Sequence, residues 1–413
     1  MDGFAAPFAA PPAALPAALP DIAAPLPALP VARPKLPEAE ALLPWLRRID
    51  RARVYANWGP LNSELERRLG ARFGASVVTV STATDGLVCA LRASLEDKPA
   101  AQRRGLCLMP AWTFVATAHA ALAAGLTPCF LDVEEAGWTL TPDRVRDVLL
   151  RRMARQGPGA AETPVSAVVA VAPFGLPVDP RPWDDFTGRT GIPVVIDAAA
   201  AFDGLAVSAT PAVVSMHATK TVCAGEGGFV ATTDADLARR VKRTANFGFF
   251  GARVAEVAGL NAKLSEYHAA VGLASLEAWP GRRAEYMAVG RRLRAALEPL
   301  GCAFLPGFAE GWVGSTCVVR LPAGRRAADV ALALGLDGVA TRAWWGGGCQ
   351  AHPAFAQCPR MPGDDPLPVT TRLADGTLGL PFFPDMTDAQ LLRVVEAMQA
   401  ALGDSTRPAR AGA

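Results

Sequence analysis

The sequence predicts an α/β protein with a large, mostly parallel sheet and a second, smaller domain. Short apolar segments such as 76–80, 165–171 and 193–197 alternate with longer segments of helical periodicity. The apolar segments do not alternate with polar residues, which is typical of parallel strands covered on both faces. The length of 413 residues exceeds what one hydrophobic core usually serves, so two domains are expected.

The elements are expected to follow one another as strand and helix over the first two thirds of the chain. The expected strands span 76–80, 106–109, 127–132, 165–171, 193–197, 213–217 and 227–232. The expected helices between them span 86–95, 113–124, 142–153, 181–189 and 234–243. A helical stretch at 264–299, with a break at Pro280-Gly281, then leads to strands near 314–321 and 338–343 and a helix from Thr387.

Composition and these elements together divide the chain. Residues 1–33 are mostly Ala, Pro and Leu, which predicts a disordered, extended tail. Residues 34–58 are expected to contribute to the small domain, and residues 59–262 to form the large domain. Residues 263–402 are expected to form the long helix and the small C-terminal domain, followed by a second disordered tail at 403–413.

Several classes of function find no support in the composition. The net charge of +2 indicates neither a nucleic-acid partner nor an anionic membrane. Residues 105–131 lack charged side chains, but Pro110, Gly125 and Pro128 divide them into strand, helix and strand, so no membrane span is expected. The 8 cysteines form no CxxC pair, and the 4 histidines form no metal-ligand pattern. We therefore expect a cytoplasmic protein without a metal site.

One lysine stands between two apolar strands. The segment 213–230 reads VVSMHATKTVCAGEGGFV, so that Lys220 follows the first strand and precedes a loop with Gly225, Gly227 and Gly228. An ammonium is costly to bury unless it is paired or neutralised. A Schiff base with a carbonyl cofactor is one way to neutralise it, and a lysine that reaches solvent from a strand end is the alternative.

Two further features favour a cofactor. Asp197 ends the strand 193–197, at the edge where open α/β sheets bind ligands. It either caps the next helix or holds the protonated pyridine nitrogen of pyridoxal 5′-phosphate (PLP). The turn Ser81–Gly86 between a strand and a helix consists of small and hydroxyl residues that suit a phosphate. Phosphate turn, carboxylate and lysine in one α/β chain fit a fold-type-I PLP enzyme.

With these motifs, the sequence resembles the DegT/DnrJ/EryC1/StrS family of PLP-dependent sugar aminotransferases. The matching segments are collinear from about residue 34 to about residue 402: Trp58-Gly59-Pro60, Ser81–Gly86, Pro110–Phe114, Asp132-Val133, Asp197–Ala199, Ser215–Lys220, Gly225–Gly228, Asn261 and Leu380–Pro384. The resemblance implies a fold-type-I PLP-dependent transferase whose large domain contains a mostly parallel, mixed sheet of seven strands.

The resemblance also implies roles for single residues. Lys220 is expected to form the Schiff base with PLP and then to move a proton between the substrate carbon and the cofactor. Asp197 is expected to keep the pyridine nitrogen protonated. Phe114 matches the aromatic residue that stacks on the cofactor ring, although a core phenylalanine fits the same position.

Four more positions match residues that surround the cofactor phosphate. Ala83, Thr84 and Ser215 are expected to cradle the phosphate within one subunit. Asn261 matches a residue that reaches the phosphate from the neighbouring subunit. The resemblance therefore implies a homodimer with shared active sites.

The chain departs from the family in several places near the expected site, among them Leu260 in place of an aromatic residue common beside the asparagine. Ala200 stands where the family usually has Gln or His beside the ring hydroxyl, and Trp344-Trp345 stand in a segment that is usually rich in tyrosine. His217 is expected to fill the strand end, and Glu226 has no assigned role. Asp85 places a negative charge beside the expected phosphate, which is unfavourable unless the carboxylate points away.

The expected function is the transfer of an amino group, with glutamate as the expected donor, to a keto sugar that is most often nucleotide-linked. One alternative acceptor is a cyclitol ketone or another specialised-metabolite ketone. A dehydratase is disfavoured, because dehydratases of this family tend to replace the lysine with histidine. A non-catalytic regulatory or binding protein on the same fold is the alternative from another class, and it would have no need of both Lys220 and Asp197.

Overall fold

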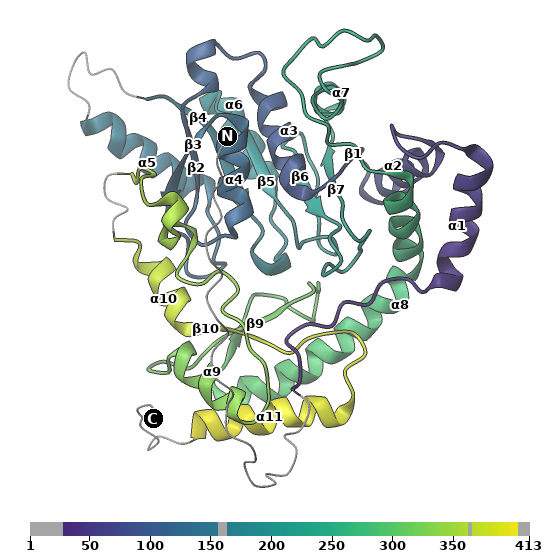
Figure 1. Ribbon diagram of the computed structural model, residues 1–413. Coiled ribbons are helices and arrows are strands. Elements are labelled where there is room, and N and C mark those ends of the chain that lie inside the picture. Colours follow the sequence, from purple (N-terminus) through teal and green to yellow (C-terminus); the bar gives the residue numbers. More distant parts are fainter. Residues whose placement is uncertain (1–27, 156–162, 362–365, 404–413) are drawn as a thin grey trace, which may run out of the picture.

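A computed structural model describes residues 28–155, 163–361 and 366–403. The large domain is built on a seven-stranded sheet, and the small domain below it contains a three-stranded sheet (Figure 1). The large sheet has the order β1-β7-β6-β5-β4-β2-β3. Its strands are β1 (Ser76–Val80), β2 (Leu106–Pro110), β3 (Thr127–Leu131), β4 (Val165–Val171), β5 (Val194–Asp197), β6 (Ala212–Ser215) and β7 (Gly228–Thr232).

The large sheet is mixed, as the family resemblance implied. β7 runs antiparallel to both of its neighbours, β1 and β6, and all other neighbouring strands are parallel. The carboxyl ends of the other six strands therefore lie along one edge of the sheet, and β7 begins at that same edge. Every loop that follows one of those six strands starts from this edge, where α/β sheets bind ligands.

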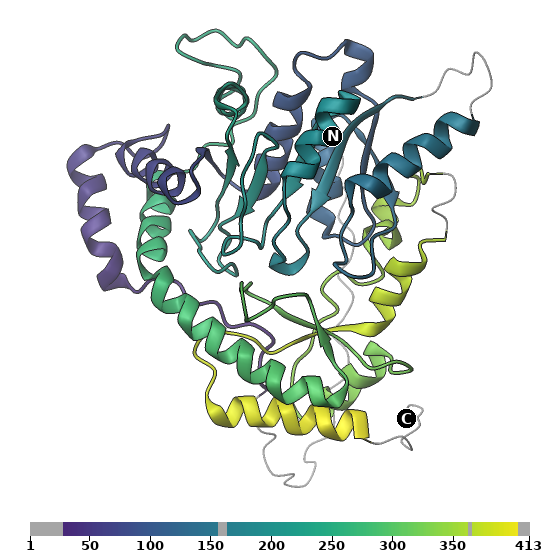
Figure 2. The same cartoon turned by 180° about the vertical axis from the view of Figure 1, so that it is seen from behind.

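Helices cover both faces of the sheet (Figures 1 and 2). Val195 of β5 faces one layer, whereas Val194 and Ile196 face the other, because successive strand residues point to opposite faces. Val195 packs with α3 (Ala83–Leu95), α4 (Val115–Ala124) and α7 (Ala235–Thr244). The opposite layer contains α2 (Pro60–Phe73), α5 (Pro142–Arg155), α6 (Arg181–Thr190) and α8 (Glu266–Leu297).

The helix α8 links the two domains, descending from the large domain to the small one (Figure 1). The expected break at Pro280-Gly281 is wrong, since the helix continues through both residues. Both lie on its exposed face, while Trp279 and Arg282 beside them are buried. Water can satisfy the carbonyl that the proline leaves without its intrahelical donor, so burial of the opposite face keeps the helix continuous.

The small domain pairs β8 (Ala303–Phe304), β9 (Cys317–Arg320) and β10 (Thr377–Leu380) as an antiparallel sheet with β9 in the centre. The strand expected at 338–343 is wrong: this segment makes only isolated bridges, Val339 to Leu29 and Arg342 to Gly379. Arg342 thus meets β10 at the edge that does not pair with β9, and the contact does not extend into a strand. Helices of this domain are α9 (Ala327–Leu336), α10 (Pro368–Gly376) and α11 (Asp388–Gly403).

The remaining helical segments are short or lie at the start of the described chain. They are α1 (Ala39–Ala52) and the 3₁₀ turns η1 (Ala100–Arg103), η2 (Pro173–Gly175), η3 (Glu298–Leu300), η4 (Cys349–Ala351) and η5 (Pro353–Phe355).

Residues 28–33, which were expected to belong to the disordered tail, pack on the small domain. The Leu29 side chain is buried, and its N–H donates to the Gly338 carbonyl at 2.8 Å. The N–H of Phe382 donates to the Val31 carbonyl at 3.1 Å. Residues 28–33 are therefore part of the packed structure, because one leucine finds a buried position that local sequence does not reveal. The rest of the expected N-terminal tail, at residues 1–27, and residues 404–413 of the C-terminal one lie outside the described residues.

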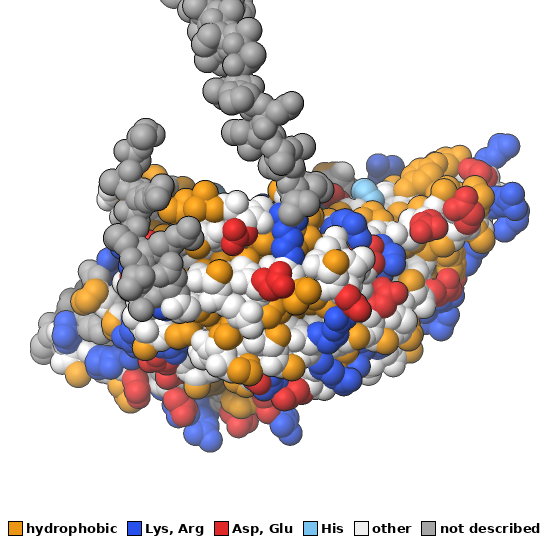
Figure 3. Space-filling view, turned by 90° about the horizontal axis from the view of Figure 1, so that it is seen from below, with side chains coloured by type: hydrophobic (Ala, Val, Ile, Leu, Met, Phe, Trp, Pro, Cys, Tyr) orange, Lys and Arg blue, Asp and Glu red, His pale blue; other side chains and the backbone are white. Residues whose placement is uncertain are grey.

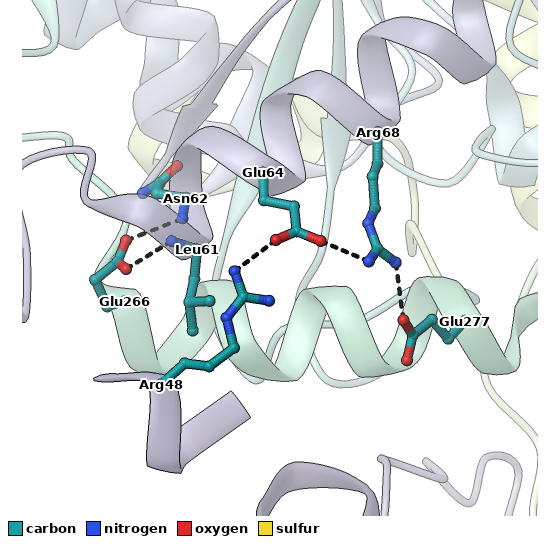
Figure 4. A network of polar contacts seen from close by, with 7 residues as sticks. All are labelled: Arg48, Leu61, Asn62, Glu64, Arg68, Glu266 and Glu277. Atoms are coloured by element: carbon teal, nitrogen blue, oxygen red, sulfur yellow. Dashed lines mark hydrogen bonds and ion pairs between the residues drawn. The ribbon is translucent and has the colours of Figure 1, made fainter. Parts of the chain in front are cut away.

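A buried glutamate fixes the start of α8 on α2 (Figure 4). The Glu266 carboxylate accepts the N–H of Leu61 at 2.8 Å and that of Asn62 at 2.9 Å, in the first turn of α2. An anion is stabilised there by free N–H groups and by the helix dipole. A Cβ at Gly59 would approach the Glu266 carboxyl carbon to 2.7 Å, so glycine lets the two segments come this close.

An ion-pair network extends this contact to α1. Glu64 of α2 accepts from Arg48 of α1 at 2.6 Å and from Arg68 at 2.5 Å, and Arg68 also pairs with Glu277 of α8 at 2.8 Å. Burial acts to raise the pKa of Glu64, but the hydrogen bonds and charges of the two arginines outweigh it and lower the pKa. The three helices are therefore held together on the outside of the large domain.

The face of the molecule seen from below carries interspersed acidic and basic side chains (Figure 3). All eight cysteines are free thiols. Across residues 28–155, 163–361 and 366–403, no helix is long and apolar enough to cross a membrane. The same residues contain no group of three or more His, Cys, Asp or Glu side chains arranged to hold a metal ion.

Candidate active site

A cavity of about 540 Å³ opens at the edge of the large sheet where six strands end. β5 ends in Asp197 and β6 ends in Ser215, and both side chains line the cavity. The turn after β1 leads into α3 at the same edge. The small domain supplies the facing wall, with Ser315, Thr316, Arg342, Trp344 and Trp345.

Lys220 lies in the connection between β6 and β7 and lines the cavity. Its backbone N–H donates to the His217 carbonyl at 2.8 Å, which closes a tight turn directly after the strand. The surrounding protein lowers the pKa of Lys220, and the nearby charge of Asp197 only partly opposes this effect. Burial thus favours the neutral amine, which is the nucleophilic form of lysine.

Asp197 is buried, with two hydrogen-bond donors. Thr117 Oγ1 donates to one carboxylate oxygen at 2.7 Å, and the N–H of Ala199 donates to the other at 3.2 Å. Thr113 Oγ1 lies 2.8 Å from Thr117 Oγ1 and extends the chain of hydroxyls. Burial raises the pKa of Asp197, while Thr117, Ala199 and the charge of Lys220 act in the opposite direction.

The first turn of α3 faces the cavity. Ala83 and Thr84 line the cavity, and their N–H groups have no acceptor within the helix. Asp85 does not line it: its carboxylate turns back and accepts from Ser81 Oγ at 2.6 Å and Thr82 Oγ1 at 2.9 Å. The negative charge of Asp85 therefore points away from the cavity and is stabilised by hydrogen bonds at the start of α3.

The start of β7 lies against this helix terminus. A Cβ at Gly228 would approach the Ala83 nitrogen to 2.9 Å and the Val214 carbonyl oxygen to 2.8 Å. Only glycine lets the strand run this close to the first turn of α3. The glycine-rich loop around Glu226 thus has a packing reason that sequence did not distinguish from a ligand contact.

Phe114 precedes α4, and its ring lines the cavity with 55% of the residue exposed. It is not the core phenylalanine that was the alternative interpretation. Asn261, by contrast, does not line the cavity of its own chain. Its side chain is exposed and accepts a hydrogen bond from Lys263 Nζ at 2.6 Å.

His217 lines the cavity instead of filling the strand end. Its Nδ1 accepts the N–H of Thr219 at 3.3 Å and lies 2.8 Å from the Thr219 hydroxyl. Its Nε2 lies 3.6 Å from Glu226 Oε1. One ring nitrogen of His217 therefore faces the turn at Thr219 and the other faces Glu226.

Aromatic residues join the two domains across the cavity. Trp345 of the small domain stacks on Phe174 of the large domain with ring centroids 4.0 Å apart, and Trp112 meets Trp345 edge-on at 5.4 Å. Phe174 adopts φ 54°, an uncommon conformation for a bulky residue, and the stack holds it there. Trp344 and Trp345, which stand in the segment that departs from the family, both line the cavity, and Phe174, which the sequence did not single out, lines it too.

Thr117 and Arg342 were also missed. For Thr117 a signal existed, because Thr113 and Thr117 are four residues apart and lie on one face of a helix start. For Arg342 no local pattern distinguishes it from other surface arginines.

The site fits the cofactor that the sequence suggested. A buried carboxylate, a lysine with a lowered pKa, and a helix N-terminus with free N–H groups are what a pyridine nitrogen, an aldehyde and a phosphate require. The sheet with its crossing loops and this cavity define the class: a fold-type-I PLP-dependent transferase.

Comparison with known proteins identifies the family within this class. The chain belongs to the DegT/DnrJ/EryC1/StrS aminotransferase family, whose sequence profile matches residues 38–399. It is a PLP-dependent aminotransferase, in agreement with the function that the motifs predicted.

Individual relatives and one structure illustrate the match. Protein Rv3402c of Mycobacterium tuberculosis (strain ATCC 25618 / H37Rv) is 28% identical over 389 residues, which cover 91% of this chain and 90% of that protein. The dTDP-4-amino-4,6-dideoxy-D-glucose transaminase of Escherichia coli is 30% identical over 258 residues, 60% of this chain and 64% of that protein. A crystal structure of DesI in the presence of its TDP-sugar product aligns with a TM-score of 0.76 and 31% identity, covering 92% of this chain and 93% of that one.

Proposed function

We propose that this aminotransferase transfers the amino group of glutamate to a keto sugar that is linked to a nucleotide. The observation that carries the proposal is the single cavity that brings Lys220, Asp197 and the N-terminus of α3 together. The E. coli relative is a transaminase of a dTDP-linked amino sugar, and DesI was solved with a TDP-sugar product. Aromatic rings on the cavity wall suit the faces of sugars and bases.

Lys220 is the residue that we assign to covalent attachment and to proton transfer. PLP, when bound, supplies an electron sink that makes the proton on the substrate's amine-bearing carbon acidic. The lowered pKa of Lys220 leaves its Nζ free to take this proton and to return it, because a neutral amine is a base and an ammonium is not. We assign Asp197, which accepts a hydrogen bond from Thr117, to hold a proton at the pyridine nitrogen.

The residues around the α3 terminus are assigned to the cofactor phosphate. The N–H groups of Ala83 and Thr84 and the hydroxyl of Ser215 are donors, and the helix dipole adds a favourable field. Phe114, exposed at the cavity wall, is assigned to the face of the cofactor ring. Ala200 lines the cavity and brings no hydrogen-bonding side chain to it.

The proposal includes a homodimer with shared sites. Asn261 is absent from the cavity of its own chain and is exposed at the surface, where a partner subunit could meet it. Exposed aromatic residues lie close to it in the chain or in space. The rings of Tyr55 and Tyr267 stack with centroids 6.3 Å apart, and the Lys263 ammonium lies 4.5 Å from the centroid of the Phe247 ring. Large exposed apolar side chains of this kind are typical of protein–protein interfaces.

An acceptor screen tests the proposed function. The PLP-loaded protein is incubated with glutamate and either nucleotide-linked keto sugars or free cyclitol ketones, and 2-oxoglutarate and the aminated product are quantified. We expect product from a keto-sugar nucleotide, and loss of product with Lys220→Ala while the protein remains folded. Product from cyclitol ketones alone would favour that alternative, and a wild-type protein that aminates neither class with any amino donor would contradict the proposal.

A subunit-mixing experiment tests the shared site. A heterodimer of one Lys220→Ala subunit and one Asn261→Ala subunit has one intact site and one doubly damaged site if Asn261 acts across the interface. We expect about half of the wild-type activity per dimer, since the two sites of a closed dimer are equivalent and taken as independent. Activity equal to the mean of the two mutant homodimers would instead place Asn261 in its own subunit's site.

A further inference from the structure

Arg342 is a positioned cation on the small-domain wall of the cavity. Its backbone is tied to β10 by two hydrogen bonds with Gly379, of 3.0 and 2.9 Å, which form an isolated antiparallel bridge. Its side chain is exposed and lines the same cavity as Lys220. The backbone is therefore rigid, whereas the guanidinium faces open space.

An aromatic platform orients this guanidinium. The central carbon of the Arg342 guanidinium lies 4.9 Å from the centroid of the Trp344 ring. The Trp344 ring is itself fixed, because a Cβ at position 379 would approach its Nε1 to 2.2 Å, so it packs directly on Gly379. Stacking on an indole leaves the in-plane N–H groups of a guanidinium available for a bidentate acceptor.

Arg342 lacks the carboxylate partner that other arginines of its surroundings have. Around the small domain, acidic side chains pair with Arg292 (Asp388), Arg294 (Glu298), Arg320 (Glu135) and Arg372 (Glu135). For Arg342, the part of the chain that the structure describes supplies no ion pair. The two acids of the cavity wall have other neighbours, since Asp197 accepts from Thr117 and Glu226 faces His217.

We propose that Arg342, held on Trp344, is an oxyanion subsite that binds an anionic group of the substrate. The inference rests on the proposed function and extends it to one wall of the cavity. An arginine fork matches two acceptor oxygens in one plane, which carboxylates and phosphates both present. Glutamate supplies a carboxylate, and a nucleotide-linked sugar supplies a diphosphate, so the shared chemistry is an oxyanion and the two sources must be separated by experiment.

Binding of non-reacting anions to the PLP-loaded, full-length protein separates the two sources. Isothermal titration is performed with glutarate, which has the carboxylates of glutamate but no amine, and with dTDP and UDP, which have the diphosphate but no sugar. The variants are Arg342→Gln, which removes the charge, and Arg342→Lys, which keeps the charge but not the planar fork. Arg292→Gln, at an exposed arginine of α8 outside the cavity, is the matched control.

We expect Arg342→Gln to weaken either glutarate or nucleotide binding by about 10-fold to 100-fold, the range for a hydrogen-bonded charge pair. Arg342→Lys should recover part of this loss, and Arg292→Gln should bind both ligands as the wild type does. Weaker glutarate binding assigns the subsite to the amino donor, and weaker dTDP or UDP binding assigns it to the acceptor. Unchanged binding of all three ligands by Arg342→Gln would overturn the subsite.

The same proteins distinguish failure of the subsite from failure of the proposed function. An Arg342→Gln protein that aminates a keto-sugar nucleotide with wild-type KM for both substrates would overturn the subsite and leave the function standing. The opposite result is also distinguishable. If the wild-type protein aminates no keto sugar, but the Arg342→Gln variant binds the anions more weakly than the wild type does, the subsite is supported and the proposed function is overturned. In each case the visible absorbance of bound PLP shows that the cofactor is in place.

Discussion

Asp132 and Asp197 occupy equivalent places in the sheet and yet have different environments. Asp132 follows β3 and Asp197 ends β5, so both carboxylates lie at the edge where the parallel strands end. Both are buried, with 3% and 7% exposure. From sequence alone the two look alike, as an aspartate after a run of apolar strand residues.

Their hydrogen bonds separate them. Asp132 accepts the N–H groups of Val369 and Thr370 at 2.8 Å each, the Thr370 hydroxyl at 2.7 Å and the N–H of Val133 at 3.0 Å. It thereby caps α10 and ties the small domain to the large sheet. Asp197 has two donors and shares its cavity with Lys220.

The difference shows how a buried acid becomes available for chemistry. A carboxylate whose oxygens are saturated by backbone donors is stabilised as an anion and has no capacity left for a ligand. A buried carboxylate with fewer donors keeps a raised pKa and an open side, which is the arrangement expected at a functional site. Asp132 is therefore structural, and Asp197 is the candidate for chemistry.

The largest expected effect is that of Asp197→Asn on turnover. We expect the PLP-loaded variant to lose activity by orders of magnitude, because the amide cannot hold a proton at the pyridine nitrogen as a carboxylate does. Single-turnover kinetics measure the proton-transfer rate, and circular dichroism verifies the fold. A variant with wild-type single-turnover rates would remove Asp197 from the chemistry.

Asp132→Asn should show the opposite behaviour. Replacing one of its oxygens with an NH₂ group leaves a donor facing the buried N–H groups at the start of α10, which we expect to cost about 1–3 kcal/mol of unfolding free energy. Turnover per folded molecule should stay close to wild type. Urea unfolding measures the free energy of unfolding, and rates normalised to the concentration of active sites measure turnover. Unchanged stability with a large loss of turnover would reverse the assignment of the two aspartates.

The pH dependence of stability gives a third contrast. Burial raises the pKa of Asp197 above its ordinary value of 3.8, so above that value the unfolded chain releases this proton before the folded apoprotein does. Over the window from 3.8 up to the folded pKa, this group therefore makes the apoprotein less stable as pH rises, by about 1.4 kcal/mol per pH unit at most. Asp197→Asn removes this contribution, so the difference in unfolding free energy, wild type minus variant, should fall as the pH rises from about 4 up to the folded pKa of Asp197. A difference that rises with pH would show instead that the folded protein stabilises the anionic form of Asp197.

The smallest expected effects come from a matched pair of threonines. Thr117 Oγ1 donates to Asp197 and Thr370 Oγ1 donates to Asp132, each at 2.7 Å. Thr→Val at either position removes one hydroxyl at nearly constant volume and is expected to cost about 1 kcal/mol. For Thr117→Val this should appear as a roughly 5-fold loss of turnover, and for Thr370→Val as a lower urea midpoint. Equal effects of both variants on turnover would show that the two acids do not differ in role.

Much of the large domain is determined by local sequence. The apolar runs and the helical periodicity between them predicted all seven strands of the large sheet, because strands covered on both faces need apolar residues throughout. The position of Lys220 directly after one strand and of Asp197 at the end of another was enough to place both at one edge. The turn before α3 could also be recognised from local sequence, because small and hydroxyl residues mark the start of a helix.

The small domain and the fine structure of the site depended on contacts between distant segments. Residues 338–343 make only isolated bridges, to Leu29 and to Gly379 of β10, and no pattern in their sequence distinguishes them from a strand. Burial of the inner face of α8 carries the helix through Pro280 against its local preference. Leu29 is ordered only because the small domain offers it a buried position.

The sequence by itself determined which chemical groups are present and which of them follow buried strands, because apolar runs mark the strands and the ends of parallel strands gather at one edge of an α/β sheet. Only the tertiary structure decided which of those groups remain available. The Asp132 carboxylate caps α10, and the Asp85 carboxylate accepts hydrogen bonds at the start of its own helix. Arg342, by contrast, stacks on Trp344 and faces the cavity. Hydrogen-bond saturation is a property of three-dimensional neighbours, and residues that are far apart in sequence supply most of them.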